Sequence, residues 1–235
     1  MVTLPNYLNK IGLNKTLSLD QFESSISQLA EELTEISFYP NYSDAVLLKS
    51  WKKLCEYSSD SNITASTTKV GMNLCEHFFP NFYDIQNKKG NSFKSLWSNP
   101  KNLEKILRWN RKSHSTPYLS ELKRGIYFCC GLTKNTMYRP HLAKMVCDSH
   151  DGNVVLDPCA GWGGRMLGVC ASGAEYIGFE PNPETYRHLL ELKEYLNSIN
   201  FNKQNLIEED PSTIKDYAPY IINRCLSGHL DCVMF

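Results

Sequence analysis

The stretch Val154–Arg165, with the sequence VVLDPCAGWGGR, decides the fold of the second half of the chain. Its three leading apolar residues predict a short buried strand that ends at Asp157. The glycines that follow permit positive φ angles and let a ligand approach the main chain. A helix that begins near Arg165 would present free N–H groups to that ligand. We therefore predict a strand, a glycine-rich turn and a helix, with a ligand at the carboxyl end of the strand.

The next predicted strand, Tyr176–Phe179, is followed by an acidic residue, Glu180. Glu180 lies 19 residues after Gly161, about the spacing at which an acid meets ribose hydroxyls in a nucleoside-binding βαβ unit. A carboxylate suits that role because it can accept hydrogen bonds from two vicinal hydroxyls. The spacing therefore favours a ligand that contains a nucleoside.

Three other interpretations of the glycine-rich turn are open. A phosphate-binding P-loop needs Gly-Lys followed by Ser or Thr, whereas Gly164 is followed by Arg165 and Met166. A dinucleotide fingerprint needs glycine or alanine where Met166 stands. The third is a tight turn that binds no ligand. The combination of strand, turn, helix, strand and acid favours the nucleoside ligand.

The rest of the second half alternates helical and strand patterns. Helices are predicted over residues 139–146, 165–171 and 183–197, and further strands over 206–207 and 230–235. Pro140 suits the first turn of the first of these helices. Alternation of this kind predicts an α/β fold with a parallel sheet and helices on both of its faces.

Residues 1–125 are predicted to be mainly helical. Helices are expected over residues 17–36, with Ser18 or Asp20 as N-cap, over 45–57 and over 102–111. Residues 58–68 are rich in Ser, Thr and Asn and predict a loop, and residues 119–130 fit either a helix or a strand. The sequence thus predicts two domains, a helical region over 1–125 and a ligand-binding domain over 126–235.

Composition is that of an ordinary globular protein, with 42% hydrophobic and 21% charged residues. The apolar runs are too short to span a membrane, and the N-terminal residues lack the pattern of a secretion signal. The nine cysteines are scattered and form no CxxC pair, which predicts reduced thiols and no metal site. We therefore expect a cytoplasmic protein without a membrane partner.

The net charge of zero conceals an asymmetry. Residues 1–130 contain 16 Lys and Arg against 12 Asp and Glu, and residues 131–235 contain 9 against 13. The basic excess is concentrated in residues 88–112, where Phe93, Trp97 and Trp109 are interleaved with the cations. Such a stretch could face the phosphates and bases of a nucleic acid, while the alternative is a solvated helix face.

Several motifs resemble those of one enzyme family. Residues 157–165 resemble the first motif of the S-adenosylmethionine-dependent DNA amino-methyltransferases, which often begins with Asp-Pro. Residues 136–140 resemble the aromatic-Thr-Pro motif of the adenine-N6 enzymes, with Arg139 where Thr would stand. Glu180 matches the acid that binds the cofactor ribose, and Glu209-Asp210 matches the motif whose acid contacts the cofactor adenine. The resemblance covers about residues 131–235.

This resemblance implies a class I, Rossmann-like fold with a mostly parallel sheet, flanking helices and S-adenosylmethionine as cofactor. It also implies methyl transfer to the amino group of a nucleic-acid base, adenine N6 in DNA first, as in restriction–modification. The residues that it assigns to cofactor binding are Tyr138, Pro140, Asp157, Pro158, Ala160, Gly161, Gly163, Glu180, Pro181 and Asp210.

The chain departs from the family at the catalytic motif, an Asp, Asn or Ser followed by Pro-Pro and an aromatic residue. Residues 231–235 resemble the strand that leads to this motif, but no Pro-Pro pair occurs in the sequence, so no catalytic residue is named and the sheet is expected to be incomplete at its C-terminal side. We expect a truncated methyltransferase or one half of a split enzyme, completed by a second chain. The alternative is a catalytically inactive S-adenosylmethionine-binding protein that acts as a regulatory subunit, a decoy or a partner-binding protein. A methyltransferase of RNA or of small molecules is a further interpretation.

Overall fold

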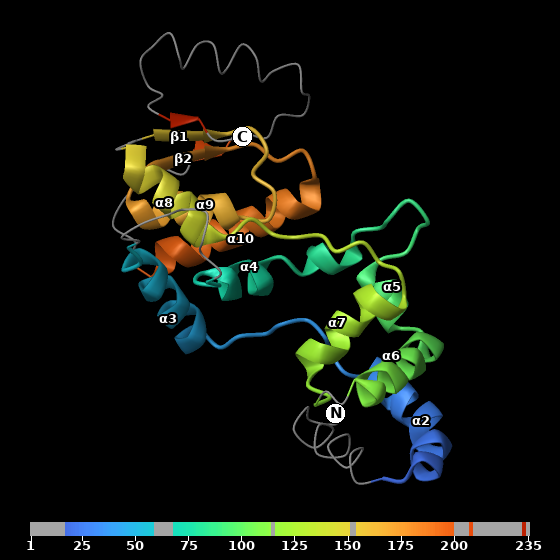
Figure 1. Ribbon diagram of the computed structural model, residues 1–235. Helices are drawn as coiled ribbons and strands as arrows, with labels where there is room; N and C mark the ends of the chain where they lie inside the picture. The colour runs from blue at the N-terminus through green and yellow to red at the C-terminus, as the bar shows by residue number, and fades with distance from the viewer. Residues whose placement is uncertain are drawn as a thin grey trace. The chain divides into compact units, whose positions relative to one another are not determined.

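The computed structural model describes residues 17–58, 68–113, 116–150 and 154–199, and the backbone of residues 207–208 and 232–233. Contacts group the chain into two compact units (Figure 1). The helical unit contains the described residues up to Tyr39 together with Asn81–Asn135, and the sheet unit contains Pro40–Pro80 and the residues from Thr136 onward. This division differs from the single boundary expected near residue 125, because residues 40–80 pack with the second half of the chain.

The helical unit consists of short helices. They are α2 (Leu19–Thr34), most of the 3-10 helix η3 (Pro80–Asp84), α5 (Phe93–Trp97), α6 (Pro100–Lys112) and α7 (Leu119–Cys129). Ser18 caps α2 as predicted, since its hydroxyl accepts from the Gln21 N–H while the Gln21 side chain accepts from the Ser18 N–H. The segment α7, which the sequence left open, is helical because it buries Leu122, Gly125 and Ile126 on one face.

One hydrophobic core holds the helical unit together. Helices α2, α6 and α7 contribute its aliphatic part, and Phe38, Tyr83, Phe93 and Trp97 form an aromatic cluster within it. Phe93 and Trp97 are only 3% and 1% exposed. The expectation that these two rings face a nucleic acid is therefore wrong, because their burial in the core contributes more stability than exposure would.

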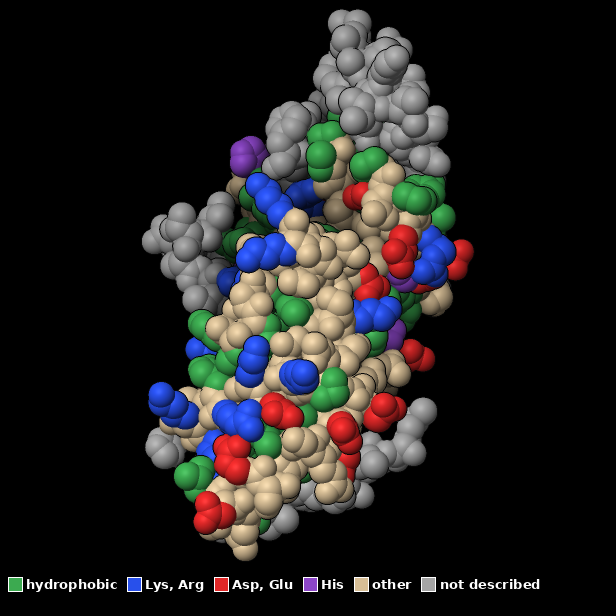
Figure 2. Space-filling view, turned by 90° about the vertical axis from the view of Figure 1, so that its right-hand side faces the viewer, with side chains coloured by type: hydrophobic (Ala, Val, Ile, Leu, Met, Phe, Trp, Pro, Cys, Tyr) green, Lys and Arg blue, Asp and Glu red, His purple; other side chains and the backbone are tan. Residues whose placement is uncertain are grey.

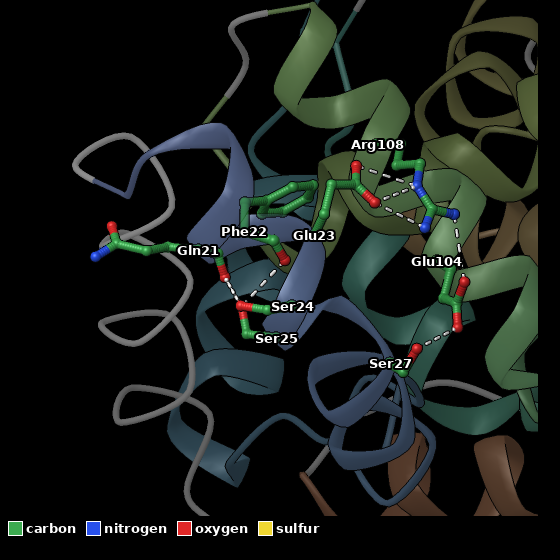
Figure 3. A network of polar contacts seen from close by, with 8 residues as sticks. All are labelled: Gln21, Phe22, Glu23, Ser24, Ser25, Ser27, Glu104 and Arg108. Carbon is green, nitrogen blue, oxygen red and sulfur yellow. Dashed lines mark hydrogen bonds and ion pairs between the residues drawn. The ribbon is translucent and has the colours of Figure 1, made fainter.

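Polar contacts join α2 to α6 on the surface of the helical unit (Figure 3). Arg108 donates to the Glu23 carboxylate through Nε and Nη2, at 3.1 and 2.9 Å from Oε2, and to Glu104 Oε2 through Nη1 at 3.3 Å. Ser27 donates to the other oxygen of Glu104. The charge of Arg108, on the side of α6 that faces α2, is thus paired with the carboxylates of Glu23 and Glu104.

The sheet unit contains four parallel strands in the order β3-β2-β1-β4. These strands are β1 (Val154–Asp157), β2 (Glu175–Gly178), β3 (Ile207–Glu208) and β4 (Cys232–Val233). In the register of the sheet Leu156 lies between Ile177 and Val233. A parallel sheet combined with helices confirms the α/β part of the prediction.

The helices of the sheet unit are α3 (Asp44–Cys55), α4 (Met72–Phe78), α8 (Pro140–His150), α9 (Gly164–Ser172) and α10 (Pro183–Ser198). Figure 1 shows α8, α9 and α10 on the same side of β1 and β2. A Cβ on Gly168 would lie 2.2 Å from the Pro140 carbonyl oxygen, so α8 and α9 pack with their backbones almost in contact. The prediction of helices on both faces of the sheet is not tested by the described residues.

Across the ranges that the structure describes, no helix has both the length and the apolar character needed to cross a bilayer. The cysteines there are free thiols: Cys55, Cys75, Cys129, Cys130, Cys147, Cys159 and Cys170. This agrees with the reduced cysteines expected from the sequence.

Candidate functional site

The turn between β1 and α9 has the backbone conformation expected from its glycines. Gly161 and Gly163 have φ angles of +59° and +68°, in the left-handed region that favours glycine. A Cβ on Gly161 would meet no atom closer than 3.7 Å, so the main chain there is open to a ligand. A Cβ on Gly163 would lie 2.8 Å from the ring of Phe79, so this second glycine permits packing against the end of α4.

Asp157 lies beneath this turn and is 0% exposed. Its Oδ2 accepts hydrogen bonds from Arg165 Nε at 2.6 Å and from the Tyr176 hydroxyl at 2.9 Å. Its Oδ1 accepts from the Cys159 N–H at 3.1 Å, and Arg165 also donates to the Cys159 carbonyl. The carboxylate therefore fixes the turn through bonds within the protein.

Tyr176 remains a hydrogen-bond donor to this carboxylate over the whole physiological pH range. Burial raises the pKa of Tyr176 well above its ordinary value, and the negative charge of Asp157 raises the pKa further. The protonated hydroxyl and the guanidinium of Arg165 together compensate the charge of a carboxylate that water does not reach.

Glu180 follows β2 and lies against the turn. Its Oε2 accepts from the Gly161 N–H at 2.8 Å, and its Oε1 accepts from the Asn182 N–H at 2.9 Å. The side chain is largely buried, with the residue 9% exposed. A carboxylate offers about four acceptor positions, so these two bonds leave capacity for hydroxyl donors of a ligand.

An open pocket of about 540 Å³ lies beside the turn, within the range of small-molecule sites. Two segments of the sheet unit form its walls. The lining residues are Thr136, Met137, Tyr138, Arg139, Leu142, Cys159, Ala160, Gly161, Trp162, Gly164 and Arg165. The Arg165 guanidinium carbon lies 5.3 Å from the centroid of the Tyr138 ring, a cation–π contact that joins the two walls.

The structure brings most of the predicted cofactor residues to this region. Tyr138, Ala160 and Gly161 line the pocket, and Glu180 is bonded to Gly161 at its edge. The others support the walls or flank them: Asp157, Gly163 and Pro140 are buried, Pro158 is half-buried and Pro181 is exposed beside Glu180. Asp210 lies outside the described residues.

Arg165 and Tyr176 are the residues that sequence reasoning missed as partners of Asp157. They lie 8 and 19 residues after it, and no motif links their side chains to that carboxylate. Trp162 lines the pocket as well. Within the described ranges, no group of three or more His, Cys, Asp and Glu side chains is placed to hold a metal ion.

Comparisons with protein-family models, with curated proteins and with solved structures find no match to this chain. The function of the pocket therefore has to be derived from its own geometry and from the motifs in the sequence.

Proposed function

We propose that the sheet unit is Rossmann-like and binds S-adenosylmethionine in the pocket beside the turn. The observation that carries this proposal is the bond from Gly161 to the Glu180 carboxylate, which joins the glycine-rich turn to the acid that ends β2. The strand order β3-β2-β1-β4 supports it, because doubly wound nucleotide-binding sheets begin with the order 3-2-1-4.

The residues present fit such a cofactor. The free acceptor capacity of Glu180 suits the two ribose hydroxyls, and the open main chain at Gly161 allows a close approach. Tyr138 and Trp162 offer aromatic surface, and Arg139 gives the pocket a cation suited to the cofactor carboxylate, while the charge of Arg165 is paired with Asp157. Asp157 acts indirectly, since its bonds hold the turn in place.

The activity we propose is methyl transfer to the amino group of a nucleic-acid base, with adenine N6 in DNA as the first candidate. When bound, S-adenosylmethionine would supply a methyl group on a sulfonium: the amine nitrogen would form the new N–C bond as the S–C bond breaks, the neutral thioether would leave, and the amine would release a proton to solvent. The protein contributes by holding the two reactants in one geometry, which replaces a costly encounter in solution. The motifs at residues 136–140 and 157–165 support this activity over other uses of the cofactor.

Calorimetric titration of the purified chain with S-adenosylmethionine tests the site. Loss of a hydrogen bond to a charged group costs about 1.5–3 kcal/mol, so we expect Glu180→Ala to weaken binding by about tenfold to 150-fold. Glu184→Ala is the matched control, because Glu184 is an exposed acid at the start of α10. Absence of binding by the folded wild-type chain, or an equal loss in both variants, would refute the site.

A second candidate is an S-adenosylmethionine-binding protein without catalysis, acting as a regulatory subunit, a decoy or a partner-binding protein. It uses the same pocket and the same bond between Gly161 and Glu180 as the enzyme, so cofactor binding alone does not separate the two candidates. Incubation with cofactor carrying a labelled methyl group and with DNA separates the two candidates. Transfer of the label to the DNA supports the enzyme. If the chain binds the cofactor but no label reaches the DNA, even after a second chain that supplies the catalytic motif is added, the result supports the binding protein.

A further inference from the structure

Helix α7 of the helical unit exposes an aromatic ring that the core does not use. Phe128 is 63% exposed, and its ring stacks on that of Trp109 from α6, with centroids 5.8 Å apart and planes at 17°. Trp109 itself is half-buried. The two rings thus form a stacked pair, an aromatic platform whose outer ring is the exposed Phe128, where a buried arrangement would have contributed more to stability.

Cations surround this platform on both helices. The Arg124 guanidinium carbon, four residues before Phe128 on α7, lies 5.2 Å from the Phe128 ring centroid. Lys105 and Lys112 are exposed on α6, where Lys105 lies four residues before Trp109 and Lys112 three residues after it. Burial raises the pKa of Cys130 while the charge of Lys105 opposes that rise, which places Lys105 near the end of α7.

Few acids compete for these cations. Glu121 lies 3.5 Å from Arg124, but the Arg124 side chain is 58% exposed, and exposed ion pairs of this kind contribute little. Glu104 and Glu23 bind Arg108 on the side of α6 turned to α2 (Figure 3). Figure 2 shows one face of the molecule, on which Lys and Arg side chains are interspersed with hydrophobic side chains and with Asp and Glu.

We propose that this surface, Lys105, Trp109, Lys112, Arg124 and Phe128, binds single-stranded nucleic acid. An unpaired base stacks on the exposed Phe128 ring and extends the Trp109–Phe128 stack, and the three cations hold the phosphates on either side. A single strand fits better than a duplex, because paired bases keep their faces inside the helix and leave nothing to stack on the rings. This inference adds to the proposed function that the nucleic acid is single-stranded. It rests on the proposed function for the assumption that the partner is a nucleic acid.

The test is fluorescence anisotropy of a labelled single-stranded oligodeoxynucleotide with the full chain, without S-adenosylmethionine. Stacking of one base on an aromatic side chain contributes about 1–3 kcal/mol, so we expect Phe128→Ala to weaken binding by about fivefold to 150-fold. Phe128→Tyr keeps the ring and should bind like the wild type. Leu19→Ala is the matched control, because Leu19 is also 63% exposed in the helical unit.

A second variant keeps the test decisive if Phe128→Ala fails to fold. Arg124→Gln should reduce the slope of log affinity against log salt by about 0.7, the contribution of one phosphate contact on a single strand. Three outcomes would overturn the proposal. The wild type could bind duplex DNA as tightly as the single strand, Phe128→Ala and Arg124→Gln could bind like the wild type, or the wild type could fail to bind at all. Because no cofactor is present, this result is independent of the calorimetric test on the pocket.

Discussion

Arg165 is the residue on which the shape of the candidate site depends most. Its side chain is 15% exposed, that of Asp157 is fully buried, and the Nε–Oδ2 distance between them is 2.6 Å. Arg165 also contacts the Cys159 carbonyl and the ring of Tyr138. One side chain therefore joins the strand end, the turn and the opposite wall of the pocket.

Arg165→Ala should lower the free energy of unfolding by about 3 kcal/mol, because removal of one partner leaves the buried Asp157 charge uncompensated. Urea denaturation followed by circular dichroism measures this. Arg187→Ala is the control, since the Arg187–Glu191 pair has side chains 58% and 43% exposed and should contribute less than about 1 kcal/mol. Similar losses in the two variants would contradict the role given to Arg165.

His141 should make the protein less stable in mild acid. It is fully buried beside Tyr57, with ring centroids 5.4 Å apart, and burial together with the nearby charge of Arg139 lowers its pKa. Below the ordinary His pKa of about 6.5 the unfolded chain binds a proton that the folded chain disfavours, so stability falls as pH falls.

The comparison that checks this is urea denaturation of the wild type and His141→Gln between about pH 7 and pH 5. The wild type should lose more unfolding free energy over that range than the variant. The remaining histidines are common to both proteins, so their titration cancels in the difference. Parallel pH profiles would show that His141 does not cause the acid sensitivity.

At the scale of elements, the close packing of α8 on α9 positions both walls of the pocket. The segment before α8 carries Tyr138 and Arg139, and α9 begins at the glycine-rich turn. Besides the Pro140 carbonyl, a Cβ on Gly168 would meet Ala143 Cβ at 2.5 Å. A backbone cannot yield as a flexible side chain does, so any added atom must push the helices apart.

Gly168→Ala should therefore cost about 1–3 kcal/mol of unfolding free energy, although alanine is the better helix former. It should also weaken S-adenosylmethionine binding, because the walls separate. Ser172→Ala, at the end of the same helix, is the control; it removes only the hydrogen bond from the Ser172 hydroxyl to the Val169 carbonyl and should cost no more than about 1 kcal/mol. A Gly168→Ala protein as stable as the wild type would show that α8 and α9 can move apart freely.

At the scale of the whole molecule, residues 40–80 from the first half of the chain form part of the sheet unit. Phe79 is buried under Gly163 of the turn, and a Cβ on Gly71 would lie 2.9 Å from Pro140 and 3.1 Å from Leu54. Helices α3 and α4 thus pack on the elements that carry the pocket. The sheet unit cannot be separated by one cut in the sequence.

A fragment of residues 126–235 should therefore show no cooperative thermal unfolding and no binding of S-adenosylmethionine. Loss of the buried side chains of residues 40–80 exposes apolar surface that the remainder cannot cover. Residues 40–80 joined by a Gly/Ser linker to 136–235 are the matched control and should unfold cooperatively. Scanning calorimetry compares the two, and a cooperative transition in the shorter fragment would contradict the division into units.

The sequence was most informative where a physical signal is local. Some patterns report their own secondary structure within a few residues. They are the cap at Ser18, the helical spacing of the apolar residues in α2 and the apolar run Val154–Leu156. Helices α4 and α5 were not predicted, because 7 and 5 residues contain too few turns for a helical period to show. The sequence predicted the separation between Gly161 and Glu180 but not the hydrogen bond from the Gly161 N–H to the Glu180 carboxylate.

By itself, the sequence determined the longer helices other than α7, the strand segments, the combination of helices with a parallel sheet and the position of the glycine-rich turn, because those depend on neighbouring residues. Only the tertiary structure decided that Phe93 and Trp97 are buried, that Asp157 binds Arg165 and Tyr176, and that residues 40–80 belong to the sheet unit. Those features depend on which side chains meet after distant segments pack, and burial of apolar surface, which is not directional, selects those partners without leaving a local pattern.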